Sequence, residues 1–210
     1  MNSAARHFAV LGATGATGRL LVTQALARGH TVTVMARNPA RLELPDSDRV
    51  LRVVADVHDP ASITAGLTGV DVLLSGLGAT KGDPGATLSA GAHAVIDAGG
   101  PRIIWLGAFG TGPSADTAGA LTRTILALAL HGELRDKVDA DTAVLRAGGT
   151  VFHAGPLTRG VLSPTRRTLT LAEVPRRLFP RSVSRATVAA AMLDEAESAC
   201  RPGRLLVPVS

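Results

Sequence analysis

Tyrosine is absent from this chain of 210 residues, and the other aromatic residues are few: Trp105 and four phenylalanines. Single-stranded nucleic acids stack their bases on aromatic side chains, so such a partner would find few contacts here. The single cysteine, Cys200, excludes an internal disulfide framework and a metal site made of cysteines alone. Because disulfides mark oxidising compartments, we expect a reducing, cytoplasmic setting.

Lysine is also rare, since Lys81 and Lys137 are the only two, and the net charge of +5 comes from arginines that are mostly scattered. No helix-turn-helix or zinc pattern accompanies them, so we expect no nucleic-acid partner. The longest apolar stretch, 118–130, contains Arg123 and is shorter than the ~20 residues that span a bilayer. Residues 1–7 are polar and lack the apolar core of a signal peptide. We therefore expect neither a membrane span nor a secretory signal.

The histidines form no metal motif, because they are far apart and no two have the short spacing of metal ligands. They are His7, His30, His58, His93, His131 and His153. We predict no metal site.

Apolar segments typical of strands alternate with helix-like segments along the whole chain. Expected strands end at residue 11 and cover 31–36, 50–55, 70–74, 102–106, 150–153, 167–171 and 205–207; expected helices cover 16–28, 61–67, 84–98, 115–130, 133–146 and 184–197. This alternation predicts a single-domain α/β fold, Rossmann-like and doubly wound, with a mainly parallel sheet flanked by helices.

A glycine-rich turn follows the first expected strand and opens the first expected helix. Gly12 allows a sharp turn, Gly15 allows close approach of another molecule, and Gly18 allows tight packing of the helix on the sheet. The free N–H groups and positive end of that helix bind phosphate. The cofactor-binding residues expected at this turn are Gly12, Thr14, Gly15, Ala16, Thr17, Gly18 and Arg19.

The end of the second strand carries a cation where NAD-selective sites carry an acid. Arg37 can pair with a 2′-phosphate, and Arg41 and Arg19 lie within reach. We therefore favour NADP(H) over NAD(H), although a solvated role for Arg37 stays open.

Two more strand ends suit a dinucleotide. After the third strand, Asp56 can accept from the adenine amino group while Val57 covers the ring; a helix-capping role for Asp56 is the alternative. After the fourth strand, Gly76, Leu77 and Gly78 allow close backbone approach to the ribose and pyrophosphate.

Motifs along nearly the whole chain resemble the atypical short-chain dehydrogenase/reductase superfamily. The runs GATGATG, VTVMARNPARL and VVADV lie within 8–57, and Leu145-Arg146, Ala154–Gly160 and Ser184–Ala189 match later family motifs. The chain is most similar to the compact NAD(P)-binding members, the biliverdin reductase B (flavin reductase) group and the NmrA-like proteins.

The resemblance also marks departures at the catalytic positions. Lys137 matches the family lysine and Asp141 the acid after it, but Glu133 stands at the tyrosine position and Gly107-Ala108 near the serine position. The usual phenol acid and its hydroxyl helper are thus missing. His153-Ala154 replaces the arginine of a later motif.

Two residues are candidates for catalysis. Lys137 can hold the nicotinamide ribose hydroxyls, with a helix-surface lysine as the alternative. His153, at the end of the sixth strand, can face the nicotinamide and donate a proton near neutral pH, or be purely structural. Gly155, Pro156 and Leu157 can wall the nicotinamide, and we expect 155–183 to form a small substrate-side segment.

Two functions follow from these residues, and both remain open. The first is NADP(H)-dependent hydride transfer to a small electron-poor acceptor, such as a flavin or quinone, without a Tyr–Lys acid. The second is an NmrA-like sensor that binds NADP(H) and performs no chemistry. An epimerase or dehydratase that keeps its cofactor bound is a weaker third. The sequence leaves the oligomeric state open.

Overall fold

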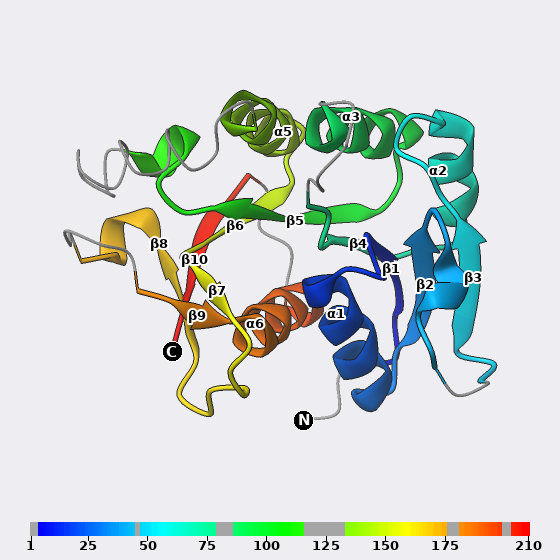
Figure 1. The fold of residues 1–210 in the computed structure, drawn as a ribbon, viewed down its shortest axis with the longest axis horizontal. Coiled ribbons are helices and arrows are strands. Elements are labelled where there is room, and N and C mark those ends of the chain that lie inside the picture. Colours follow the sequence, from blue (N-terminus) through cyan, green and yellow to red (C-terminus); the bar gives the residue numbers. More distant parts are fainter. Residues whose placement is uncertain (1–3, 45–46, 79–85, 116–132, 176–180, 199–202) are drawn as a thin grey trace.

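A mostly parallel sheet runs through the centre of the protein, with helices on both of its faces (Figure 1). The computed structural model describes residues 4–44, 47–78, 86–115, 133–175, 181–198 and 203–210. Within these ranges eight strands form the main sheet in the order β3-β2-β1-β4-β5-β6-β10-β8. Its pairs are parallel except for β8, which runs antiparallel to β10.

The strands are β1 His7–Leu11, β2 Thr31–Ala36, β3 Val50–Val54, β4 Val72–Ser75, β5 Arg102–Ala108, β6 Thr150–Ala154, β7 Leu157–Thr158, β8 Arg167–Thr170, β9 Val183–Ser184 and β10 Leu205–Val209. The α-helices are α1 Ala16–Ala27, α2 Pro60–Gly66, α3 Thr87–Ala98, α5 Leu134–Arg146 and α6 Arg185–Glu197. Short 3-10 turns cover Pro39–Arg41, Gly112–Ser114 and Leu171–Glu173. None of the helices in the described ranges combines the length and apolar character needed to cross a bilayer.

These elements confirm the predicted doubly wound α/β fold. The helix expected over 115–130 lies outside the described residues from 116 on. The small parallel pair β7–β9 was not expected, because strands of two residues are too short to show a periodic pattern. Its Leu157 lies opposite Val183.

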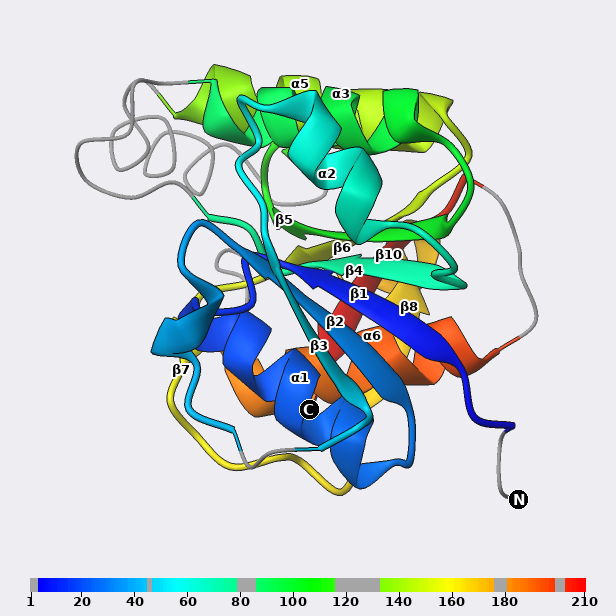
Figure 2. The same ribbon diagram turned by 90° about the vertical axis from the view of Figure 1, so that its right-hand side faces the viewer.

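Helices α1 and α6 cover one face of the sheet, and α2, α3 and α5 cover the other (Figure 2). The central strands are therefore buried on both faces, as in other parallel sheets. Leu21 and Met192 belong to the core between the sheet and α1 and α6. Leu88 and Val144 belong to the core under α3 and α5.

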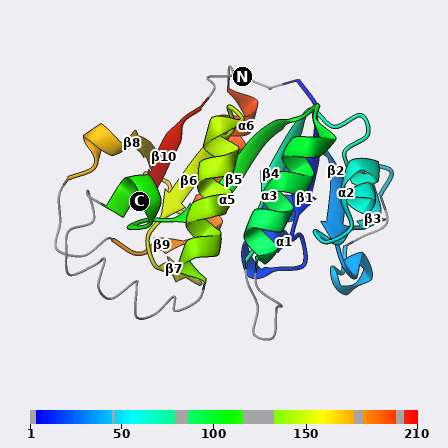
Figure 3. The ribbon, with the colours of Figure 1, turned by 90° about the horizontal axis from the view of Figure 1, so that it is seen from above.

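The chain reverses direction across the sheet beside β1, which lies between β2 and β4. Parallel strands bring their carboxyl ends to one edge, and the edge beside such a reversal is where open α/β sheets bind ligands. Seen from above, α3 and α5 lie over the strands that lead to this edge (Figure 3).

An ionic cluster holds α6 against α1 and the start of β2. Glu197 Oε1 lies 3.0 Å from Arg28 Nη1 and 3.0 Å from His30 Nε2. Burial acts to raise the pKa of the Glu197 carboxyl, but hydrogen bonds from His30 and Arg28 outweigh it and hold that pKa below its usual value. This cluster fixes the position of α6, whose first residue enters the site.

Candidate functional site

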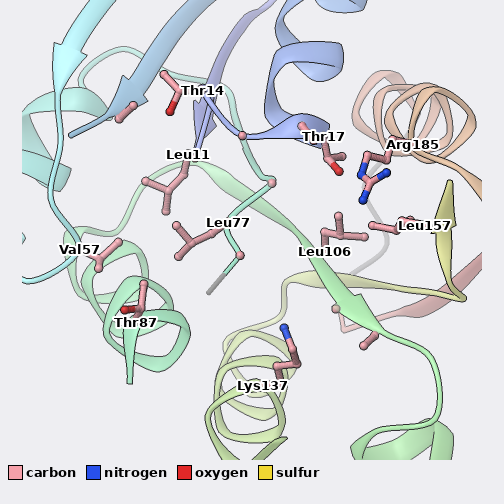
Figure 4. Close-up of a pocket in the computed structure, with 18 of the residues that line it drawn as sticks. Leu11, Thr14, Thr17, Val57, Leu77, Thr87, Leu106, Lys137, Leu157 and Arg185 are labelled. Atoms are coloured by element: carbon pink, nitrogen blue, oxygen red, sulfur yellow. The ribbon is translucent and has the colours of Figure 1, made fainter. Parts of the chain in front are cut away.

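A cavity of about 530 Å³ opens at the carboxyl edge of the sheet (Figure 4). Small-molecule and cofactor sites have volumes of roughly 300–1,000 Å³, so this cavity is large enough for such a ligand. The described residues that line it are Leu11, Gly12, Thr14, Gly15, Ala16, Thr17, Ala36, Arg37, Ala55, Asp56, Val57, His58, Gly76, Leu77, Gly78, Thr87, Leu106, Gly107, Ala108, Lys137, Ala154, Gly155, Leu157 and Arg185.

The glycine turn forms one wall of the cavity. Gly12 has a φ of +72°, and a Cβ there would lie 3.0 Å from the Leu77 Cα, so a side chain would be both strained and crowded. A Cβ on Gly18 would lie 2.2 Å from the Gly12 carbonyl oxygen, so this glycine serves packing and does not line the cavity. The structure thus places the turn at the cavity. Gly12 and Gly15 line the cavity, whereas Gly18 allows close packing of α1.

The first turn of α1 is suited to an anion. Gly15 is the N-cap, no side chain caps the helix, and no acidic residue lies in the first turn. The first N–H groups of a helix have no intrahelical partners, and the helix dipole adds partial positive charge. Gly15, Ala16 and Thr17 line the cavity here. These features fit the pyrophosphate of a dinucleotide cofactor.

Three arginines, Arg19, Arg37 and Arg41, were expected to act near the end of β2. Of these three, Arg37 lines the cavity. Arg19 donates from Nε to the Thr14 carbonyl over 2.9 Å and from Nη2 to the Arg41 carbonyl over 3.0 Å. Arg19 and Arg41 are exposed and lie outside the lining. Arg19 therefore ties the glycine turn to the 3-10 turn after β2, a role that differs from the expected direct contact.

Asp56 and Val57 line the cavity, as Arg37 does, and contact with the adenine ring stays a prediction. Asp56 does not cap α2, because Asp59 occupies the N-cap position. The Asp56 carboxylate instead accepts a hydrogen bond from the His58 N–H over 3.0 Å, which orders the loop after β3. This local bond leaves the second carboxylate oxygen of Asp56 for a ligand.

Thr87, at the start of α3, lines the same end of the cavity although the sequence did not single it out. Its side chain is buried, and among the described residues its Oγ1 is the buried side-chain atom that has no hydrogen-bond partner. Buried hydroxyls are almost always paired. Figure 4 shows Thr87 below Val57, where a ligand would lie next to both.

The opposite end of the cavity is formed by the ends of β5 and β6 and by α5. The Lys137 side chain points from α5 into the cavity (Figure 4). Gly155 and Leu157 line this end, whereas Pro156 is exposed and does not. Leu106 lies across from Lys137, so an apolar wall faces the cation that α5 contributes to the described lining.

The structure corrects the expectation that His153 faces this end of the cavity. His153 is fully buried and does not line the cavity. Its Nε2 lies 3.0 Å from Asp141 Oδ2, and its Nδ1 lies 2.6 Å from Ser114 Oγ. Both ring nitrogens are engaged, so His153 cannot hand a proton directly to a ligand. The sequence correctly placed His153 near the end of its strand, but it did not indicate on which face of the sheet the ring lies.

Ser114, His153 and Asp141 resemble the components of a hydrolytic triad, but the geometry excludes that chemistry. Ser114 is fully buried, so no substrate carbonyl can reach its Oγ. Its Oγ accepts from the Gly110 N–H over 2.8 Å and also lies 3.1 Å from the Thr111 carbonyl oxygen. The three side chains instead connect the segment after β5, strand β6 and helix α5.

The same network explains why glycine occupies the serine position near the end of β5. A Cβ on Gly107 would lie 2.5 Å from Asp141 Oδ2, closer than non-bonded atoms allow. The carboxylate that binds His153 therefore occupies the space that a side chain at position 107 would need. Gly107 itself lines the cavity, so this end presents backbone at the position where the superfamily usually has a serine hydroxyl.

Arg185, the first residue of α6, also lines the cavity. Arg185 falls within the Ser184–Ala189 motif of the resemblance, but that motif gave it no expected role at the site. The helix start itself was detectable, because Ser184 caps α6 by accepting from the Thr187 N–H over 3.1 Å. The position of this helix start beside the cavity depends on tertiary packing, which the sequence pattern did not reveal.

A parallel sheet with a glycine turn, an uncapped helix N-terminus and a lined cavity at the carboxyl edge defines a dinucleotide-binding Rossmann protein. The model of a family described as NAD(P)H-binding matches residues 12–199 of the chain. The protein belongs to this NAD(P)H-binding family, which confirms the cofactor class predicted from the glycine turn.

Solved structures share the fold over almost the whole chain. A protein provisionally named NADH-flavin reductase from Streptococcus pneumoniae TIGR4 has a TM-score of 0.78 and 18% identity, covering 98% of this chain and 99% of its own. A short-chain dehydrogenase/reductase from Veillonella parvula DSM 2008 in complex with NADP has a TM-score of 0.77 and 15% identity, covering 98% and 94%. An anaerobilin reductase from Escherichia coli O157:H7 has a TM-score of 0.74 and 18% identity, covering 97% and 96%. At these identities the likenesses show that the fold is shared.

Proposed function

We propose that this protein is an NADP(H)-dependent reductase that transfers hydride to a small electron-poor acceptor, such as a flavin or a quinone. The observation that carries the proposal is the composition of the cavity. One end combines Arg37 with the glycine turn, and the other presents Leu106, Gly107 and Lys137; the described lining residues at that second end include no serine, tyrosine or histidine. A nucleotide is held at the first end, and its ring meets the acceptor at the second.

The preference for NADP(H) rests on the charge at the end of β2. Arg37 lines the cavity, and the described strand end carries no acid that would accept from a ribose 2′-hydroxyl. A guanidinium pairs with a 2′-phosphate in a fork of two hydrogen bonds. The relative from Veillonella parvula was solved with NADP.

The acceptor class follows from the missing acid. The chain has no tyrosine, Gly107 provides no hydroxyl, and His153 is buried in its own network. When bound, the reduced nicotinamide supplies two electrons and one proton as hydride. Flavins and quinones take up hydride without a strong general acid, and their second proton comes from solvent. Two of the solved relatives are named as reductases of flavin and anaerobilin.

The protein's part in this reaction is binding and orientation. Lys137 holds the nicotinamide ribose hydroxyls through its ammonium, and its helix is anchored through Asp141, one turn further on. The backbone at Gly107 and Gly155 and the Leu157 side chain wall the ring. The small segment 155–183 borders the acceptor and forms the substrate side.

A non-catalytic NADP(H) sensor is the second candidate. The observation that favours it is the same Gly107, because a family site without its hydroxyl and phenol retains nucleotide binding but loses its usual chemistry. A sensor binds the oxidised and reduced nucleotide and turns over neither.

A titration followed by an acceptor panel tests the proposal. NADPH is added while the fluorescence of Trp105, the only tryptophan, is recorded, and NADH is titrated in parallel. NADPH oxidation is then followed at 340 nm with FMN, riboflavin and a benzoquinone. Selective binding with turnover supports the reductase. Binding without turnover of any acceptor indicates the sensor, and no binding of either nucleotide rejects both.

Arg37→Glu is expected to reverse the cofactor preference. The variant loses the charge-assisted hydrogen bonds of the guanidinium to the 2′-phosphate and places a negative carboxylate beside that phosphate. NADPH binding should therefore weaken roughly 100-fold, equivalent to about 2.8 kcal/mol. NADH binding should weaken little, because the new carboxylate can accept from the 2′-hydroxyl. Both dissociation constants are measured by the same titration.

Arg52→Glu, an exposed charge reversal on β3 outside the cavity lining, is the control. Equal NADPH affinity in the parent and Arg37→Glu would show that Arg37 is not the selector.

A further inference from the structure

We infer that Arg185 is an anion-binding residue at the acceptor end of the cavity, where it pairs with a phosphate or carboxylate group. The inference rests on the proposed nucleotide site and adds a recognition element to it. Figure 4 shows the Arg185 guanidinium directed into the cavity beside Thr17 and Leu157. It is half-buried, and none of the described residues forms a hydrogen bond or ion pair with its guanidinium.

The position of Arg185 is unfavourable for the helix that carries it. Arg185 opens α6 directly after its Ser184 cap, and the first turn contains no acid. A cation at a helix N-terminus opposes the helix dipole. Thr17 belongs to the first turn of α1, which has no side-chain cap and is likewise free of acids. The guanidinium thus lies beside two helix ends that are both partially positive.

The cavity offers no acid to offset this charge. Asp56 is the single acid among the described lining residues, and it lies at the β3 end with Arg37. Lys137 adds a second cation to the end that Arg185 borders (Figure 4). A cation kept half-buried among positive groups is stabilised when an anionic ligand binds.

Two ligands can supply the anion. The nucleotide brings its pyrophosphate to the first turn of α1, where Thr17 lies. The acceptor brings an anionic substituent along Leu157, which pairs in β7–β9 with the strand that leads into α6. The chemistry is the same, a planar guanidinium forming a charge-assisted fork with two oxygens.

Arg185→Gln tests the inference, with Arg185→Lys as the charge-retaining variant. Arg159→Gln is the control, because Arg159 is an exposed arginine next to β7 that does not line the cavity. Three quantities are measured for each: the NADPH dissociation constant, the KM for FMN and the KM for riboflavin, which lacks the phosphate. The unfolding midpoint without ligand is measured as well.

A rise of about tenfold or more in the NADPH dissociation constant of Arg185→Gln, partly restored in Arg185→Lys, assigns the anion to the nucleotide. An unchanged NADPH constant with a similar rise in KM for FMN alone assigns it to the acceptor. In both cases the unfolding midpoint should not fall, whereas a structural arginine would lower it. Unchanged values for NADPH and FMN in an active protein overturn the inference. Failure of the parent protein to bind NADPH counts against the proposed function instead.

Discussion

Gly15→Val is expected to weaken NADPH binding by about 100-fold or more while leaving the fold intact. Gly15 lines the cavity at the N-cap of α1, and its φ of −73° and ψ of 167° suit any residue. A Cβ there would have the Gly12 carbonyl oxygen at 3.2 Å as its nearest neighbour, which requires only a small adjustment. An isopropyl group would occupy the space where a phosphate reaches the helix N–H groups. Each charge-assisted hydrogen bond lost costs roughly 1.5–3 kcal/mol.

Trp105 fluorescence quenching by NADPH measures this loss, and a thermal unfolding curve checks the fold. Thr23→Val introduces the same side chain on the exposed part of α1 and should bind NADPH like the parent. Gly15→Ala should fall between the parent and Gly15→Val. A Gly15→Val protein that binds NADPH as tightly as the parent would mean that the phosphate does not lie at this turn.

His153→Leu is expected to lower the free energy of unfolding by about 3–5 kcal/mol at pH 7. The Asp141 carboxylate is 1% exposed and bonds to His153 Nε2, so the variant leaves a buried charge without its partner. Leucine fills most of the imidazole volume, which keeps the cavity cost small. Typical domains are stable by about 5–15 kcal/mol, so this loss is a large fraction of the total.

Urea unfolding of the parent and variant, followed through Trp105, gives the difference. Combining His153→Leu with Asp141→Asn should recover much of the loss, since the buried charge is then removed. A deficit under about 1 kcal/mol would indicate that the pair contributes little to stability.

The nucleotide end of the site follows from short, contiguous stretches of sequence. Strand β1, the glycine turn and α1 are consecutive, so spacing alone predicted this fold unit and its glycine turn, which the structure places at the cavity. Arg37 and Asp56 were predicted because parallel strands end at one edge. The fold class and the cofactor class could therefore be predicted from local sequence patterns, because tertiary packing does not change what those patterns indicate.

The Lys137 end of the cavity was predicted only in part, because its residues come from elements distant in the chain. Every residue of β6 is buried, so no alternation of polar and apolar residues indicated which way His153 points. Its partners Asp141 and Ser114 lie on α5 and after β5, and their meeting is visible only in the folded chain.

The sequence by itself determined that this chain folds as a doubly wound sheet of the NAD(P)H-binding class, because those properties depend on strand, turn and helix in succession. Tertiary structure decided the rest. It buried His153 against Asp141, filled the space beside Gly107 with a carboxylate, and brought Arg185 into the cavity from the far end of the chain. The reason is that side-chain burial and charge proximity depend on which elements pack together, and no local spacing encodes that choice.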